Sequence, residues 1–403
     1  MTKQQTLFVL LLTLMITPCL RAQKKELSQA RSYIKSGKDF DKAAKLMTDL
    51  LAGSAAHREN KDIYLTWYQA VSMQYEAANE KLYLGQQYDT AAFFDLTRRM
   101  YLITESLDSL DARPDEKGRI RPKYRREHAS AMNALRPNLF FGGNYHLRKA
   151  AYDTAFNFFD TYIDAARQPL FSAYRYDSID RQRICDAAYW ATYCGYQLHD
   201  AERTLKYSQL ALEDRAKIPY TLQYLCEVYR WQQRDSLYAA TLYEGFSRYP
   251  EHPYFFPRLR DYLTQKKQDD QALEIANKAL TVNPQNTLFL LARSLALLNL
   301  SRYAECIETS EQIIALNDTL PDPYYNVATA YLNQAFELEN RHDSRKYRTE
   351  LTNLYFAARP YMEIYRKLAP DDKKRWAPAL YRIYFNLNMG KNFDEIDRLM
   401  KKL

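Results

Sequence analysis

The sequence predicts an all-α protein built from tandem antiparallel helical hairpins. Its composition favours helix, because only 9 glycines and 15 prolines occur among 403 residues and 47% of the residues are hydrophobic. A similar apolar pattern recurs at a fixed distance along the chain, around Ala272 and around Cys306. A fixed period of this kind indicates a repeat array and not two or three separate globular domains. The stripe of the clearest helix consists of Ala272, Ile275, Ala276, Ala279 and Leu280.

Residues 1–22 have the pattern of a secretory signal peptide. Lys3 precedes an almost unbroken apolar run at residues 7–16, which is too short to span a bilayer because a spanning helix needs ~20 residues. We expect cleavage after Ala22. The alternative is a lipid anchor at Cys19, but Pro18 stands where lipoprotein processing prefers a small residue. The mature protein is expected in the periplasm or on the periplasmic face of the outer membrane, with no transmembrane segment.

Net charge gives little indication of a partner. The formal charge of +8 includes Lys3 and Arg21, so the chain without residues 1–22 carries 55 − 49 = +6. Spread over the remaining residues, this excess is mild and does not indicate nucleic acid.

Four cysteines follow the predicted signal peptide. None belongs to a C-x-x-C pair, and no metal-ligand pattern surrounds them. An oxidising compartment permits disulfides, so their disulfide state stays open, although buried free thiols are the favoured interpretation. The four are Cys185, Cys194, Cys226 and Cys306.

The second helix of each expected hairpin opens with an aromatic residue, and a small residue usually follows three positions later. Gly37, Gly85 and Gly390 precede three of these pairs, where the chain must reverse. This pattern resembles the tetratricopeptide repeat, which has a 34-residue period. The resemblance implies a right-handed superhelical solenoid of about eight or nine helix pairs. The pairs are Phe40/Ala43, Tyr88/Ala91, Tyr152/Ala155, Tyr303/Cys306 and, as a weaker copy, Phe393/Ile396.

Uneven spacing divides the expected array. We expect N-terminal hairpins at 23–110, a charged linker loop at 111–122, a central array at 123–320, and long helices with a capping hairpin at 321–403. The closing stretch resembles exported repeat proteins of Bacteroidetes-type bacteria, a family that implies an architecture and a compartment but no established activity.

The resemblance also implies which residues face the concave groove, because positions 2, 5, 9 and 12 of each first helix line it. Tyrosines suit recognition, and a leucine stripe left in water marks an interaction site. A buried core is the alternative for both stripes, and the register before Tyr238 could slip by one residue to Ala239. The candidate partner-binding residues are Tyr189, Tyr193, Tyr196, Tyr220, Arg230, Tyr254, Leu288, Leu291, Leu295 and Leu298.

A basic segment near the expected linker is a candidate anion-binding edge. A solvated loop is the favoured alternative, because runs of charge usually only hydrate a surface. Its residues are Arg119, Arg121, Lys123, Arg125 and Arg126.

No catalytic, metal or cofactor motif is recognisable. The six histidines are scattered, and no glycine-rich phosphate loop occurs. We therefore expect a non-catalytic scaffold of the cell envelope that binds a segment of another exported protein, with no nucleic acid and no cofactor. The alternatives are a glycan-binding protein that uses the tyrosines, or a hydrolase whose carboxylates meet only in the fold.

Overall fold

The computed structural model describes residues 23–341 and 344–402, so the predicted signal peptide lies outside the described residues. Every regular element in these ranges is helical, in agreement with the expected all-α repeat array. None of the described helices combines the length and apolarity that crossing a bilayer requires. Contacts divide the chain into two compact units, one ending at Arg234 and the other beginning at Asp235.

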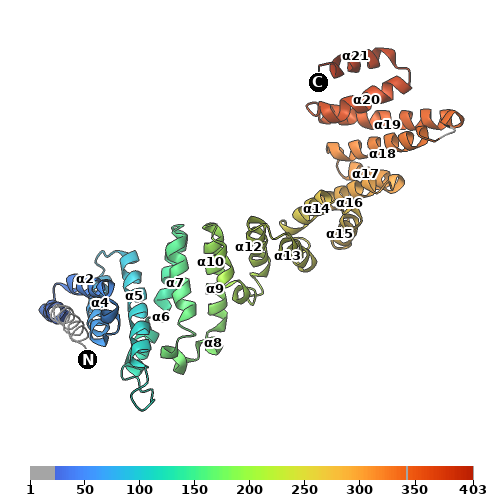
Figure 1. The fold of residues 1–403 in the computed structure, drawn as a ribbon. Coiled ribbons are helices and arrows are strands. Elements are labelled where there is room, and N and C mark those ends of the chain that lie inside the picture. The colour runs from blue at the N-terminus through green and yellow to red at the C-terminus, as the bar shows by residue number, and fades with distance from the viewer. Residues whose placement is uncertain (1–22, 342–343, 403) are drawn as a thin grey trace, which may run out of the picture. The chain divides into compact units, whose positions relative to one another are not determined.

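The N-terminal unit stacks hairpins formed by the helix at residues 23–36 with α2, α4 with α5, α6 with α7, and α9 with α10 and α11 (Figure 1). Its last helix is α12. The bounds are α2 Phe40–Gly53, α3 Ala55–Arg58, α4 Lys61–Tyr83, α5 Thr90–Asp111, α6 Arg125–Arg148, α7 Tyr152–Asp164, η1 Pro169–Tyr174, α8 Tyr176–Ile179, α9 Arg181–Gln197, α10 Ala201–Lys206, α11 Ser208–Ala211 and α12 Ile218–Trp231.

The C-terminal unit continues the pattern with the hairpins α14–α15, α16–α17, α18–α19 and α20–α21. Two of its helices, α18 and α19, are longer than their neighbours, as the sequence predicted. The bounds are α13 Asp235–Arg248, α14 Phe255–Gln265, α15 Asp269–Val282, α16 Thr287–Asn299, α17 Tyr303–Leu316, α18 Pro321–Glu339, η2 Ser344–Tyr347, α19 Arg348–Leu368, α20 Lys373–Asn386 and α21 Gly390–Met400.

The repeat period is visible in the turns that end the first helices. Four of the non-glycine residues with left-handed backbone, with φ between 53° and 58°, are each separated from the next by one full period of the repeat. At each turn the next amide donates to the carbonyl five residues earlier, for example Asp200 to Gly195 at 3.0 Å and Arg302 to Leu297 at 2.9 Å. These are Schellman motifs, which satisfy carbonyls that the helix end leaves unpaired. The four residues are His199, Gln233, Lys267 and Ser301.

These turns fix the register that the sequence left open. The residue five positions after each turn is Thr204, Tyr238, Ala272 or Cys306. Tyr238 therefore occupies the small position without a slip to Ala239, and it is partly exposed while the other three are buried. Tyr238 lies on α13, the first helix of the second unit. The turn before α21 differs from expectation, because Asn388 takes the left-handed conformation and Gly390 begins the helix.

Small residues allow the helices to approach closely. A Cβ on Gly195 would lie 2.4 Å from the backbone nitrogen of Thr204, so only glycine fits where α9 meets α10. In the hairpin α16–α17, Ser294 lies 2.6 Å from the Ser310 hydroxyl and 3.5 Å from the Cys306 sulfur. All four described cysteines are free and buried, which agrees with the favoured interpretation.

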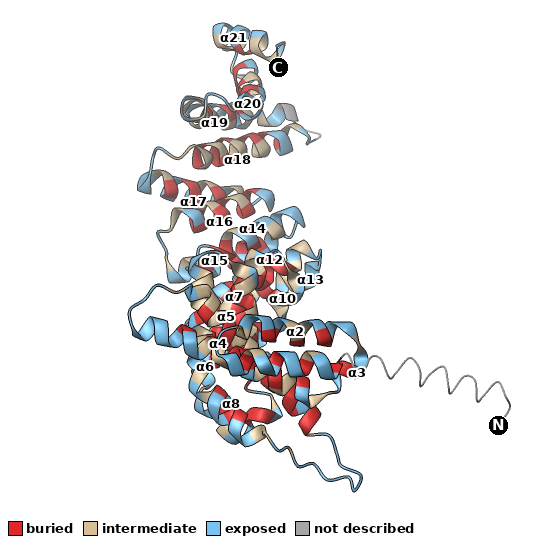
Figure 2. Ribbon diagram, turned by 90° about the vertical axis from the view of Figure 1, so that its left-hand side faces the viewer, coloured by how far each residue is buried: buried red, intermediate tan, exposed pale blue. Residues whose placement is uncertain are grey.

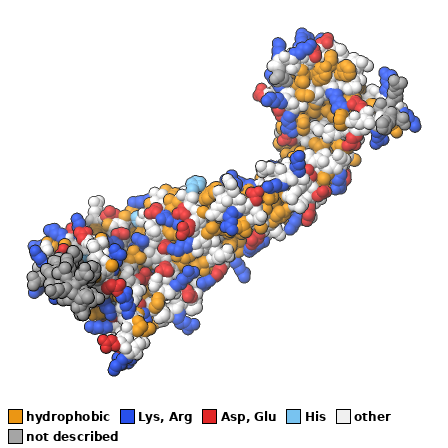
Figure 3. Space-filling view, viewed as in Figure 1, with side chains coloured by type: hydrophobic (Ala, Val, Ile, Leu, Met, Phe, Trp, Pro, Cys, Tyr) orange, Lys and Arg blue, Asp and Glu red, His pale blue; other side chains and the backbone are white. Residues whose placement is uncertain are grey.

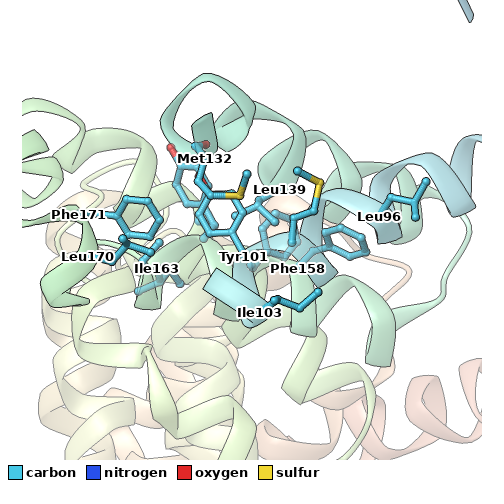
Figure 4. Packing of buried hydrophobic residues seen from close by; sticks show 14 of the residues in the cluster. Leu96, Tyr101, Ile103, Met132, Leu139, Phe158, Ile163, Leu170 and Phe171 are labelled. Atoms are coloured by element: carbon cyan, nitrogen blue, oxygen red, sulfur yellow. The ribbon is translucent and has the colours of Figure 1, made fainter. Parts of the chain in front are cut away.

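Buried side chains form a continuous core between the helices of each unit, while the outer faces are exposed (Figure 2). In the N-terminal unit, Tyr101 packs beside Met132 and Phe171, and its hydroxyl donates to the Met132 carbonyl at 2.6 Å (Figure 4). The aromatic residues of this cluster are therefore part of the core.

One buried cation connects α6 with the irregular segment before α9. The Arg136 guanidinium lies between two tyrosine rings, 3.7 Å from the Tyr162 centroid and 4.0 Å from the Tyr176 centroid. It also pairs with Asp180 and donates to the Tyr162 hydroxyl at 2.8 Å. Because a buried charge is tolerated only when it is paired, these contacts fix residues 169–180 against α6.

Gly195→Ala should destabilise the protein by about 2–3 kcal/mol, because the new methyl group would overlap backbone atoms that cannot move aside cheaply. Gly53→Ala is the matched control, since nothing lies within 4 Å of a Cβ at that helical position and alanine favours helix. Urea denaturation measures both. Equal stabilities of the two variants would contradict the close approach of α9 and α10.

Candidate partner-binding surfaces

Helices α9 and α12 of the N-terminal unit carry an aromatic cluster, defined here as Tyr189, Trp190, Tyr193, Tyr196, Tyr224 and Trp231. The Tyr196 ring stacks on Tyr224 at 4.8 Å between centroids and on Trp231 at 5.7 Å. The hydroxyls of Tyr189 and Tyr224 are 3.1 Å apart. Aromatic pairs at these distances stabilise each other beyond simple burial, so the cluster holds α9 and α12 together.

Exposure separates the predicted tyrosines into two groups. Tyr189 is only 6% exposed, and burial raises the pKa of its hydroxyl. Tyr193 and Tyr196 are half-buried, while Tyr220 and Arg230 are exposed, with Arg230 paired to Glu227. The aromatic cluster therefore has a buried inner part and an accessible edge.

A cation borders the same cluster. The Lys217 ammonium lies 4.7 Å from the Tyr189 ring centroid and 5.2 Å from that of Trp190. Burial raises the pKa of the Asp186 carboxyl on α9, while the charge of Lys217 opposes that shift. Polar groups thus adjoin the accessible edge of the aromatic cluster, as is usual where large rings are partly exposed to solvent.

Sequence reasoning missed three members of the cluster, Trp190, Tyr224 and Trp231. Trp190 and Tyr224 are separated by one full period, so they occupy the same position in successive repeats. Two aromatic residues one repeat apart are a signal in the sequence from which the cluster could have been predicted. It was overlooked because the groove positions implied by the resemblance did not include it.

A second candidate surface is a hollow of about 270 Å³ in the C-terminal unit, which we call the leucine hollow. Leu291 and Leu295 of α16 form its apolar part. Its other lining residues come from α14, α16, α18 and α20, all first helices of their hairpins, as expected for the groove. These residues are Arg260, Asp261, Thr264, Ala292, Asp322, Asn326 and Arg375.

Polar contacts hold the rim of the leucine hollow in place. The Arg375 guanidinium lies 3.8 Å from the Tyr325 ring centroid and donates to the Asp322 carboxylate at 3.1 Å. The Asn326 amide donates to Ser294 at 3.0 Å, which ties α18 to α16. Asp261 accepts from Arg260 at 2.6 Å. A rim fixed in this way can bind a ligand without first ordering its own side chains.

Three predicted groove residues are corrected by the structure: Tyr189, whose burial is described above, and two residues of the C-terminal unit. Tyr254 is only 5% exposed, because it packs beside Phe255 and the Arg258 guanidinium lies 3.9 Å from its ring centroid. Leu298 is 8% exposed and belongs to the core of α16. Leu288 remains at the surface with 38% exposure. The leucine stripe is therefore accessible over part of its length only.

The candidate anion-binding edge lies partly in the loop at residues 112–124, between α5 and α6. Arg125 binds both oxygens of Asp108 at 2.8 and 2.7 Å, and Arg119 pairs with Asp115 at 2.7 Å. These two cations are thus engaged within the molecule. Figure 3 shows cationic and acidic side chains interspersed on the face in view. Arg121, Lys123 and Arg126 are exposed, with the Lys123 ammonium over the Tyr124 ring.

A half-buried carboxyl lies apart from both candidate surfaces, on α5. Burial, together with the nearby charges of Asp164 and Asp160, raises the pKa of Glu105 from its ordinary value of 4.5 to about 8. One of its oxygens is buried without a hydrogen-bond partner among the described residues. Within those residues, no group of three or more His, Cys, Asp or Glu could hold a metal ion.

Helical hairpins follow one another along the chain, four turns lie one full period apart, and small residues lie where paired helices meet. These hairpins are tetratricopeptide-type repeats. No protein-family model matches the chain, and no curated protein does. The repeat type therefore rests on the period and packing of the chain itself.

Solved structures of tetratricopeptide repeat (TPR) proteins resemble the fold of this chain but share little sequence with it. The C-terminal part of a TPR repeat-containing protein from Cytophaga hutchinsonii is 14% identical, with a TM-score of 0.43 over 64% of this chain and 92% of that one. YrrB, a TPR protein with an unusual peptide-binding site, is 16% identical, with a TM-score of 0.35 over 49% and 92%. Yeast Tom70 is 13% identical, with a TM-score of 0.33 over 91% and 89%.

Glu105→Gln should change how stability depends on pH. With a raised pKa in the folded state, Glu105 retains a proton that the unfolded chain releases, so wild-type stability falls as pH rises from about 4.5 to about 8. The variant does not lose stability in this way. The difference in unfolding free energy between Glu105→Gln and wild type should therefore grow, in favour of the variant, by roughly 2–4 kcal/mol between the ends of that window. Urea denaturation across the pH range tests this, with the exposed Glu80→Gln as control. Parallel curves for wild type and Glu105→Gln would exclude the shift.

Proposed function

We propose that this protein is a non-catalytic scaffold that holds an extended segment of another exported protein along the first helices of its hairpins. The leucine hollow carries the proposal. Its apolar part, Leu291 and Leu295, suits an apolar side chain, while the carboxylates, amide and guanidinium on its rim suit the polar backbone of an extended peptide. Peptide recognition commonly combines one buried anchor with such a polar surround.

The accessible edge of the aromatic cluster is a second contact surface in this proposal. Tyr193, Tyr196 and Trp231 are half-buried, so part of each side chain stays available to a partner. Tyrosine and tryptophan give large contact area at low entropic cost, because their side chains have few rotatable bonds. The cluster is already packed against itself, which makes it a preorganised surface.

The two alternatives have less support from the contacts. The rings of Tyr196, Tyr224 and Trp231 stack on one another, so these faces are engaged within the protein and not presented to a sugar. In the leucine hollow, Asp261 and Asp322 are each held by an arginine. Glycoside hydrolysis needs a carboxylic acid that can donate its proton beside a second carboxylate, and these ion pairs do not provide one.

Site-directed photocrosslinking in the native host tests the scaffold function. A photoreactive residue at position 291 should capture a protein adduct, because a bound segment would touch that position. Adding Leu295→Asp should reduce capture by about tenfold or more, since a charge would be buried against the bound apolar anchor. The matched control places the same residue at Leu316, which is exposed on the second helix α17. The same adducts at both positions, or none at position 291, would contradict the proposal.

Export to the periplasm or the periplasmic face of the outer membrane belongs to the same proposal and is supported by the pattern of residues 1–22. The mature protein should begin at Gln23, as measured by mass spectrometry of the N-terminal peptide from fractionated cells. A lipid-modified Cys19 at the N-terminus would replace free periplasmic location with membrane anchoring. Retention of Met1 in cytosolic material would overturn export.

A further inference from the structure

A cavity of about 530 Å³ lies in the C-terminal unit among α19, α20 and α21, and we call it the basic pocket. Its volume falls in the range of small-molecule sites, roughly 300–1,000 Å³. None of its lining residues belongs to the leucine hollow or to the aromatic cluster. The proposed scaffold function therefore does not use it.

Positive charge dominates the lining. The lining contains four cationic residues and one carboxylate, a net charge of 4 − 1 = +3: Arg366, Lys373, Arg398, Lys402 and Glu395. Glu395 is engaged by Arg366 at 2.6 Å. No ion pair within 4.0 Å joins Lys373, Arg398 or Lys402 to a carboxylate of the described residues, although Arg398 donates through Nε to the Asp394 carbonyl at 3.0 Å. Several cations around one cavity favour a ligand with more than one negative charge.

A buried donor provides an independent observation. Trp376 lines the pocket and is only 3% exposed, yet its indole Nε1 has no hydrogen-bond partner among the described residues. The indole N–H can only donate a hydrogen bond, so it needs an acceptor as its partner. Buried polar groups are nearly always hydrogen-bonded in proteins, so this N–H, which has almost no exposed surface, still needs an acceptor.

Two further features suit an organic molecule that carries the anion. The Trp376 ring, Pro370 and Leu399 supply apolar surface within the same cavity, and the Arg366 guanidinium lies 4.9 Å from the Trp376 ring centroid. Helix α20 begins at Lys373, on the lining, so the positive end of a 14-residue helix adjoins the cavity. Charge and apolar surface thus occur side by side.

We propose that the basic pocket binds a small phosphorylated molecule. Its phosphate oxygens accept hydrogen bonds from Arg398, Lys402 and the Trp376 indole, and its carbon skeleton lies against Leu399 and Pro370. A phosphate group fits better than a carboxylate, because its second charge and additional oxygens match several cations and an additional donor.

Isothermal titration calorimetry of the full chain with glucose 6-phosphate tests this site. Binding should occur in the millimolar range or tighter at low salt, weaken as salt is added, and be absent with glucose. The double variant Arg398→Gln/Lys402→Gln should weaken binding about tenfold or more, because two charge-assisted hydrogen bonds are lost. Trp376→Phe, which keeps a ring but removes the N–H, should weaken it about tenfold.

The matched control is Lys374→Gln/Lys391→Gln, which removes the same charge from exposed lysines outside the pocket lining. It should bind as wild type does, and thermal melts confirm that each variant is folded. No binding by wild type, equal binding by the Arg398/Lys402 variant, or equal weakening in the control would overturn the proposal. Inorganic phosphate that binds as tightly as glucose 6-phosphate would overturn the role of the apolar surface.

Discussion

The packing of the hairpins depends on the close approach of two helices at small residues, which a left-handed turn joins in several of them. Where Gly195 meets the Thr204 backbone, no side chain fits, and where Ser294 meets Ser310 two hydroxyls hydrogen-bond across the gap. A bulky residue at such a contact forces the helices apart, because protein interiors have little free volume. Tyr238 occupies the equivalent position on the first helix of the C-terminal unit.

Both candidate surfaces follow from this packing. When the small faces of two helices meet, the large side chains of the first helices must pack between repeats or face outward. In the N-terminal unit they pack against each other as the aromatic cluster, with Tyr224 buried and Tyr193 partly wet. In the C-terminal unit, Leu291 and Leu295 are left half-buried behind a polar rim. The same rule therefore produces an aromatic surface and an aliphatic hollow from different residues at equivalent positions.

The period, the hairpins and the helical class could be predicted from the sequence because they depend on residues close in the chain. The burial of individual side chains could not. Tyr254 is covered by Arg258, four residues away, and Leu298 lies within the core, although both occupy positions that the resemblance assigns to the groove. Arg125 belonged to a basic run in the sequence, but its partner Asp108 lies on the preceding helix. Such pairings depend on the path of the loop that joins the two helices, and local sequence patterns do not encode that path.

The left-handed residues His199, Gln233, Lys267 and Ser301 have a consequence for the history of the gene. Because equivalent turns recur at a constant interval, recombination between any two of them adds or removes whole hairpins and leaves the helical register unchanged. Each new neighbour would meet the same kind of surface that it replaced. An array of this design can therefore change its length by duplication and deletion, while its individual helices diverge to recognise different molecules.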